Sequence, residues 1–246
     1  MPISRANGVD LLNVRGLTEA LKEADAVIDV SSVVTARRGE SVEFFSHATQ
    51  NILTAEQFAG VRHHVALSIV GVDRVRYGYY EGKHVQEELV RSSAIPHTVL
   101  RATQFHEFAG QMLDRMRFGP VSAIPSMLCR PVAAAEVADL LVDIADTGPD
   151  WSDGSSMAEM AGPEVLTLYA MVRKLRRARG DHHPAVPVTV PGRAGKVMRN
   201  GGLLPIGPYH RGVVTFDAWL SDPLSAAGGY ARQSTRTRSA KVGGRH

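Results

Sequence analysis

The 246-residue sequence has too few cysteines for a disulfide scaffold, and its ten histidines are not arranged as metal ligands. It contains one cysteine, Cys129, which cannot form an internal disulfide and has no cysteine partner for a structural metal site. We predict that Cys129 is a small core residue. His63 and His64 are adjacent at the start of a predicted strand, so they should face opposite ways. His182 and His183 lie in a predicted loop, and no metal site is predicted.

Long apolar segments are also missing. The hydrophobic content of 44% suits a globular protein, yet no run approaches the 18 apolar residues of a membrane span. The first residues show no charged leader followed by an apolar stretch, so we expect no signal peptide and a cytoplasmic location. The length is sufficient for one main domain with a substantial core.

Acidic residues are absent from the last 15 positions, which carry five of the 28 basic residues. Without these five, 23 basic and 25 acidic residues remain, so the net charge of +3 belongs to the C-terminal segment. Residues 223–246 have almost no large apolar side chains, and we predict a disordered basic tail there. We expect no specific nucleic-acid partner; the alternative is a polyanion-binding surface formed by this tail and the helix face carrying Arg176 and Arg177.

Strand-like and helix-like segments alternate along the chain. Predicted strands cover residues 26–30, 65–70, 98–100 and 157–161, and predicted helices cover residues 17–24, 40–58, 79–92, 134–143 and 166–179. Such alternation is typical of an α/β protein with a parallel sheet covered by helices on both faces. We expect residues 1–222 to form this domain, with a small substrate-side region at about residues 125–222.

Three polar residues predict a site for proton transfer. Tyr79 and Lys83 are four residues apart at the start of a predicted helix, so both side chains lie on one face. The ammonium would lower the pKa of the tyrosine and let it exchange a proton with a carbonyl oxygen, while Ser68 at a strand end would hydrogen-bond the substrate. The alternative is structural: a turn residue at Ser68 and an ordinary amphipathic helix face.

A longer set of segments resembles a known family. These segments are ADAVIDVS (24–31), GVRHHVALS (60–68), YYEGK (79–83), QEEL (86–89), RATQF (101–105), RPVA (130–133), AGPE (161–164) and TFDAWL (215–220). Together they resemble the NmrA-like atypical short-chain dehydrogenase/reductases, which bind NAD(P) on a Rossmann-like sheet. The resemblance implies Ser68, Tyr79 and Lys83 as catalytic residues. It places the cofactor, NADP or NAD, against Val30, Ser31, Ser32, Lys83, Ala102, Thr103 and Gln104.

The glycine-rich loop of such proteins is missing. A Gly-x-x-Gly-x-x-Gly turn lets the backbone approach the cofactor pyrophosphate, and this sequence contains no such turn after an early strand. By the resemblance, about 30 N-terminal residues are absent, and the strand at 26–30 becomes an exposed sheet edge. We expect poor solubility or a homodimer through that edge. Two origins stay open: a start that lies further upstream, or a gene that has lost its cofactor half.

The expected function is the reduction of a small carbonyl compound by NAD(P)H, with activity weak or lost because the glycine loop is absent. The alternative is a regulatory or scaffold protein that senses NAD(P) without turnover. The sequence does not distinguish NAD from NADP, because the discriminating residue follows a strand that is absent. It does not identify the substrate.

Overall fold

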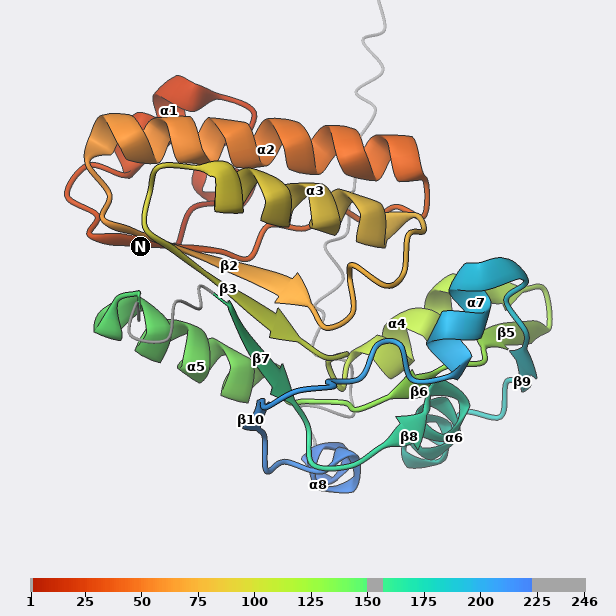
Figure 1. Ribbon diagram of the computed structural model, residues 1–246. Helices are drawn as coiled ribbons and strands as arrows, with labels where there is room; N and C mark the ends of the chain where they lie inside the picture. The colour runs from red at the N-terminus through yellow and green to blue at the C-terminus, as the bar shows by residue number, and fades with distance from the viewer. Residues whose placement is uncertain (1, 150–156, 223–246) are drawn as a thin grey trace, which may run out of the picture.

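The computed structural model describes residues 2–149 and 157–222. Its centre is a five-stranded sheet in the order β1-β2-β3-β7-β10, in which every neighbouring pair is parallel (Figure 1). The strands are β1 (Ala26–Asp29), β2 (His63–Ile69), β3 (His97–Ala102), β7 (Met157–Ala161) and β10 (His210–Arg211). The predicted parallel α/β sheet is confirmed.

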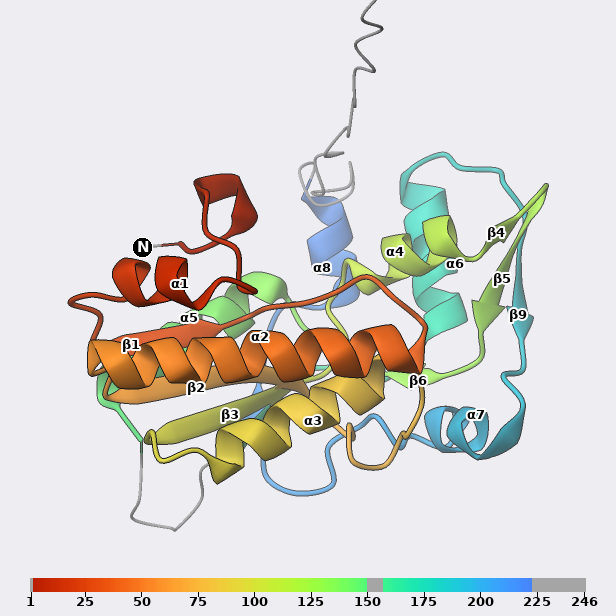
Figure 2. The same ribbon diagram turned by 90° about the horizontal axis from the view of Figure 1, so that it is seen from above.

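Helices cover both faces of this sheet. A short 3-10 turn (Arg5–Asn7), α1 (Val14–Ala20), α2 (Arg38–Ala59) and α3 (Tyr79–Ser92) lie on one face, and α5 (Ala134–Thr147) lies on the other (Figure 1). Seen from above, α2 and α3 lie side by side over the sheet and run roughly along its strands (Figure 2). Phe45 and Ile52 of α2 are buried, as the apolar periodicity predicted. Gly60 ends α2 with a φ of 77°, the left-handed conformation that favours glycine.

Strand β1 lies at one edge of the sheet. Among the described residues it pairs with β2 alone, from Ala26 opposite His63 to Asp29 opposite Ala66. The predicted edge position is therefore confirmed. Dimerisation through this edge stays a prediction.

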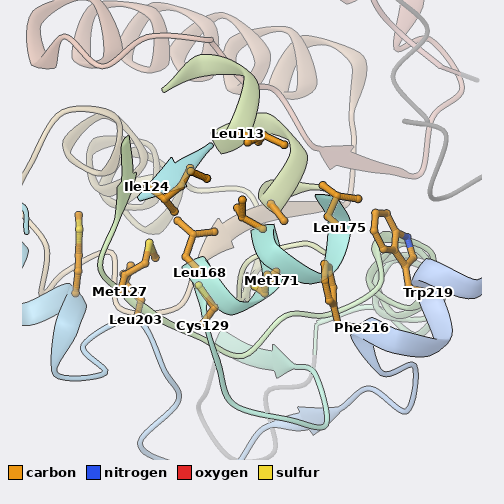
Figure 3. Close-up of a cluster of buried hydrophobic side chains, with 14 of the residues drawn as sticks. Leu113, Ile124, Met127, Cys129, Leu168, Met171, Leu175, Leu203, Phe216 and Trp219 are labelled. Atoms are coloured by element: carbon orange, nitrogen blue, oxygen red, sulfur yellow. The ribbon is translucent and has the colours of Figure 1, made fainter. Parts of the chain in front are cut away.

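A second lobe packs beside the carboxyl ends of the strands (Figure 1). It contains the sheet β4 (Arg117–Phe118), β5 (Val121–Pro125) and β9 (Ala185–Val188), the pair β6 (Leu128–Cys129) and β8 (Leu166–Thr167), and the helices α4 (Phe108–Arg115), α6 (Leu168–Ala178), α7 (Gly192–Arg199) and α8 (Phe216–Ser221). Figure 3 shows its core, where Leu113, Ile124, Leu175 and Phe216 converge from different elements. Cys129 is fully buried in this core, as predicted.

Several predicted helix boundaries were wrong: the helix expected at 134–143 continues to Thr147, and the helix expected at 17–24 ends at Ala20. Two differences at helix starts have a local cause. The helix expected at 17–24 begins at Val14, because the side chain of Asn13 accepts a hydrogen bond from the Gly16 amide and caps the helix. The helix expected from residue 166 begins at Leu168, because the preceding two residues pair with β6 as β8. Both differences arise from capping or pairing contacts that a hydrophobic period does not encode.

Within the described residues, none of the helices combines the length and apolar character that crossing a bilayer demands. The predicted tail at 223–246 lies outside the described residues.

Candidate functional site

The first turn of α3 meets the carboxyl end of β1. Gly78 precedes the helix with a φ of 51°, and a β-carbon at this position would lie 2.7 Å from the carbonyl oxygen of Ala36. Only glycine tolerates both conditions. This close approach holds residues 30–37, which follow β1, against the start of α3. It brings Tyr79 to the end of β1.

The phenol of Tyr79 is hydrogen-bonded to Ser32. Its hydroxyl oxygen lies 2.9 Å from Ser32 Oγ, and either atom can be the donor. Burial raises the pKa of the Tyr79 phenol above its ordinary value, while the hydrogen bond with Ser32 acts in the opposite direction. The expected lowering of this pKa by Lys83 is therefore wrong. Desolvation of the phenol is the dominant effect, and Lys83 is not among the groups that shift its pKa.

Lys83 is held inside the protein, with an exposed fraction of 3%. Its ammonium donates to the carbonyl oxygen of Leu67 at 2.6 Å and to the side-chain oxygen of Gln86, and it lies 4.9 Å from the centre of the Phe45 ring. Burial lowers the pKa of Lys83 to about 8, while the negative charges of Asp29 and Glu87 act against that lowering. An ammonium with a pKa near neutrality changes its charge within the working pH range of an enzyme.

Asp29 connects the segment that carries Ser32 with the buried ammonium of Lys83. One oxygen of its buried carboxylate accepts from the Ser31 backbone amide at 2.8 Å, and the other accepts from the Gln86 side-chain amide at 2.7 Å. Asp29 therefore fixes the turn that carries Ser32 and, through Gln86, the ammonium of Lys83. The sequence argument did not assign a role to Asp29, although a carboxylate inside the apolar strand at 26–30 was a detectable signal.

The structure does not place Ser68 in this hydrogen-bonded set. Its side chain is 3% exposed, and its Oγ has no hydrogen-bond partner among the described residues. Ser68 lies opposite Arg101 in the sheet, on the face covered by α3. The structure joins Tyr79 to Ser32, and Lys83 to the Leu67 carbonyl beside Ser68.

The residues after β3 form the other half of the candidate cofactor site. Ala102 is buried, and Thr103 donates from its hydroxyl to the carbonyl oxygen of Arg130 at 2.5 Å. The side chain of Gln104 is 8% exposed, and neither its amide nitrogen nor its amide oxygen has a partner among the described residues. Buried polar atoms without partners are costly, so this amide is suited to a polar ligand.

A buried ion pair connects helix α3 with strand β3. Arg101 of β3 donates two hydrogen bonds to Glu87 of α3, at 2.9 and 2.7 Å, and both side chains are almost fully buried. Arg91 and Asp73 complete the network from the partly exposed side. This two-bond geometry fixes α3 against the sheet. It thereby fixes the helix that carries Tyr79 and Lys83.

Two surface depressions lie away from these residues. One of about 230 Å³ lies between α2 and the end of α3, where Gln50 and Ile95 line it. The other, of about 400 Å³, lies on α7 beside Arg193 and Lys196. Neither is lined by Tyr79, so neither cavity marks the chemistry. Among the described residues, no group of three or more potential metal ligands occurs.

Comparison with known proteins identifies the class of ligand. Residues 5–147 match the family model described as NAD(P)H-binding, which covers more than half of the chain. The chain belongs to this NAD(P)H-binding family. A comparison with curated proteins finds no match. The cofactor class expected from the sequence, NADP or NAD, agrees with this family.

Solved structures agree with the family in fold. An NADPH-dependent quinone oxidoreductase from Escherichia coli has a TM-score of 0.58 and 18% identity, covering 88% of this chain and 84% of its own. The same enzyme complexed with NADPH has a TM-score of 0.56 and 18% identity, with coverages of 82% and 77%. A UDP-glucose 4-epimerase from Bifidobacterium longum, in complex with NAD+ and UDP, has a TM-score of 0.63 and 11% identity, with coverages of 90% and 82%. At such identities the likeness establishes the Rossmann-like fold alone.

Proposed function

We propose that this NAD(P)H-binding protein reduces a small carbonyl compound, with Tyr79 as the proton donor. The observation that carries the proposal is the position of Tyr79. Its phenol lies at the carboxyl end of the parallel sheet, where ligands bind in such folds, one helical turn before a buried ammonium whose pKa is about 8. The NmrA-like resemblance and a cytoplasmic location belong to the same proposal.

The residues present fit a nicotinamide cofactor. Ser31 Oγ and the Gln104 amide are buried polar atoms without partners among the described residues, and they lie after β1 and β3 as the resemblance implies. The two strand ends that would hold it also include Val30, Ala102 and Thr103. Lys83 has two acceptors for its three N–H groups, which leaves one for a ribose hydroxyl. When bound, NAD(P)H supplies the hydride that a carbonyl carbon accepts.

The side chains would then transfer one proton to the substrate. Tyr79 would donate its phenolic proton to the carbonyl oxygen as negative charge develops there. The hydrogen bond with Ser32, which acts to lower the Tyr79 pKa, would stabilise the phenolate that remains. The resemblance assigns Ser68 to the substrate oxygen, which its hydroxyl does not reach from its present buried position. The small second lobe would cover the substrate.

Two matched tyrosine variants test the proposal. The full chain is first titrated with NADPH and with NADH by fluorescence, and turnover is then measured with small aldehydes, ketones and quinones. We expect Tyr79→Phe to lower kcat/KM by roughly 100-fold or more, with the NADPH dissociation constant nearly unchanged. Tyr80→Phe is the control, because Tyr80 packs against the core of the second lobe. It should keep the wild-type rate.

Three outcomes would contradict the proposal. Absence of cofactor binding would remove its basis. Binding without turnover would favour the sensor alternative, in which the dinucleotide reports the redox state to a partner. Equal activity in Tyr79→Phe and wild type would show that another group supplies the proton.

A further inference from the structure

We propose that Ser32, and not Ser68, is the catalytic hydroxyl that acts with Tyr79. This inference rests on the proposed function, because it assigns a role within that same site. The inference is based on the contacts that the two serine hydroxyls make. Ser32 Oγ lies 2.9 Å from the Tyr79 hydroxyl, whereas Ser68 Oγ is buried and has no partner among the described residues.

The two serines differ in access as well as in contact. Ser32 is exposed, on the segment that follows β1, so an arriving substrate can reach the atoms beside it. Ser68 is 3% exposed, beneath α3. A hydroxyl that must contact a reacting oxygen has to be accessible to the substrate, and Ser32 meets this condition without any rearrangement.

Ser32 is also held in place from both sides along the chain. The Asp29 carboxylate accepts from the backbone amide of Ser31, which fixes the turn immediately before Ser32. On the other side, the backbone at Ala36 packs against Gly78 so closely that no β-carbon would fit between them. The segment between these two contacts is therefore positioned, and positioning of a hydrogen-bonding group is what catalysis requires.

The same carboxylate positions the lysine. Gln86 donates to Asp29 at 2.7 Å and accepts from the ammonium of Lys83. Asp29 thus sets the position of the hydroxyl partner of Tyr79 through Ser31, and the position of the cation through Gln86. Ser68 has no hydrogen bond to either group among the described residues. In this chain Ser32 is hydrogen-bonded to Tyr79, and Lys83 is connected to this pair through Gln86, Asp29 and the Ser31 backbone amide.

The chemistry assigned to Ser32 is a hydrogen bond to the oxygen that loses the proton. As the Tyr79 O–H bond breaks, its proton forms a new O–H bond on the carbonyl oxygen, and the electron pair stays on the phenolate. The carbonyl carbon would accept the hydride that bound NAD(P)H supplies. Ser32 keeps its own proton and donates a hydrogen bond to the phenolate oxygen. This bond stabilises the anion, in agreement with its effect on the Tyr79 pKa.

Three variants of the full chain separate the two serines: Ser32→Ala, Ser32→Thr, which keeps a hydroxyl, and Ser68→Ala. The first measurement needs no turnover. Alkaline absorbance titration of each variant, with and without Tyr79→Phe in the same background, isolates the ionisation of Tyr79. We expect Ser32→Ala to raise the Tyr79 pKa, Ser32→Thr to restore it, and Ser68→Ala to leave it in place.

The second measurement is steady-state reduction of a quinone by NADPH. We expect Ser32→Ala to lower kcat by about 10- to 100-fold, the effect of losing one hydrogen bond to a charged group, with the NADPH dissociation constant nearly unchanged. Ser32→Thr should recover most of the rate, and the loss in Ser68→Ala should be at least about tenfold smaller than in Ser32→Ala. A weakened NADPH affinity with unchanged kcat would instead make Ser32 a cofactor ligand and overturn the inference.

The failures can be told apart. In an active enzyme, a larger loss in Ser68→Ala than in Ser32→Ala, or a Tyr79 pKa insensitive to Ser32→Ala, overturns the assignment of Ser32 alone. A wild-type chain that binds NADPH but turns over no carbonyl compound overturns the proposed function, and the catalytic role of Ser32 with it. The titration then still shows whether Ser32 and Tyr79 are coupled.

Discussion

The two faces of the central sheet are built from alternate residues of the same strands, yet they differ in chemistry. On the α5 face, Val65 and Leu100 pack against Val137 and Leu141 in an apolar cluster. On the α2 and α3 face, the buried residues include ionisable groups at the centre of the sheet, namely Asp29, His64, Lys83, Glu87 and Arg101. One face therefore resembles an ordinary core, and the other is a polar network.

This difference separates stability from function. Burying charges costs desolvation energy that a pair recovers only with good geometry, so an apolar replacement is often equally stable. The α5 face achieves stability mainly by apolar burial. The polar face lies under α3, the helix that carries Tyr79. We infer that its charges are kept for positioning and proton chemistry, and that stability by itself does not require them.

The largest expected effect comes from breaking the Arg101–Glu87 pair on one side. Arg101→Ala leaves Glu87 buried without its two-bond partner, and we expect the free energy of unfolding to fall by about 3–5 kcal/mol. Leu100→Ala, one residue earlier on the apolar face, is the matched change, with an expected cost of about 2–5 kcal/mol. Both are measured by urea denaturation.

The double variant Glu87→Met with Arg101→Met tests whether the buried charges of the polar face themselves add stability. It removes both buried charges and fills their volume, so we expect stability near that of the wild type. The same variant should still lose turnover, since α3 is no longer held in register by the two hydrogen bonds. A double variant as unstable as Arg101→Ala would mean that the polar face is itself a source of stability.

Most of the larger elements of the central domain could be predicted from the sequence. Helix α3 and strand β7 have the predicted bounds, because a long amphipathic stripe and a strand flanked by turn residues are local patterns. Strands β4, β6, β8 and β10 have two residues each, so they contain no period to detect. Their existence depends on pairing with distant segments. The helices α4, α7 and α8 also went unpredicted, although α8 begins at a threonine cap.

The site was predictable only in part, for the same reason. The shared face of Tyr79 and Lys83 follows from helical spacing, and the glutamine three residues after Lys83 lies on that face too. The contact between Ser32 and Tyr79 joins residues 47 positions apart, and no spacing rule predicts it. The raised pKa of Tyr79 was likewise hidden, because desolvation depends on packing that only the folded chain displays.

The next effect concerns the pH dependence that Lys83 gives to the polar face. In the folded chain burial lowers its pKa from 10.5 to about 8, so the folded state releases this proton before the unfolded state does. Below about pH 8 both states hold the proton and the full cost of the buried charge is present. As the pH rises from about 8 toward 10.5, that cost is relieved and stability increases.

Lys83→Met should remove this pH dependence. We expect the variant to be more stable than wild type at pH 7 by up to about 3 kcal/mol, and the difference to shrink as the pH approaches 10. Other titrating groups act equally in both proteins, so the difference between their denaturation curves isolates Lys83. If the free energy of unfolding depends on pH in the same way in both proteins, the Lys83 ammonium is not desolvated as described.

The smallest effect comes from the one polar pair described on the apolar face. His63 Nε2 lies 3.0 Å from the hydroxyl of Thr98, and burial lowers the pKa of His63, which favours the neutral ring. Thr98→Val keeps the shape of the side chain but removes the hydroxyl partner of that ring nitrogen, so we expect a loss of about 1 kcal/mol. Thr49→Val on α2 is the control, because Thr49 is fully buried and its hydroxyl has no partner among the described residues. Thermal denaturation should show little change or a small gain for Thr49→Val. Equal losses in both variants would mean that burial of a hydroxyl, and not its pairing, determines its effect on either face.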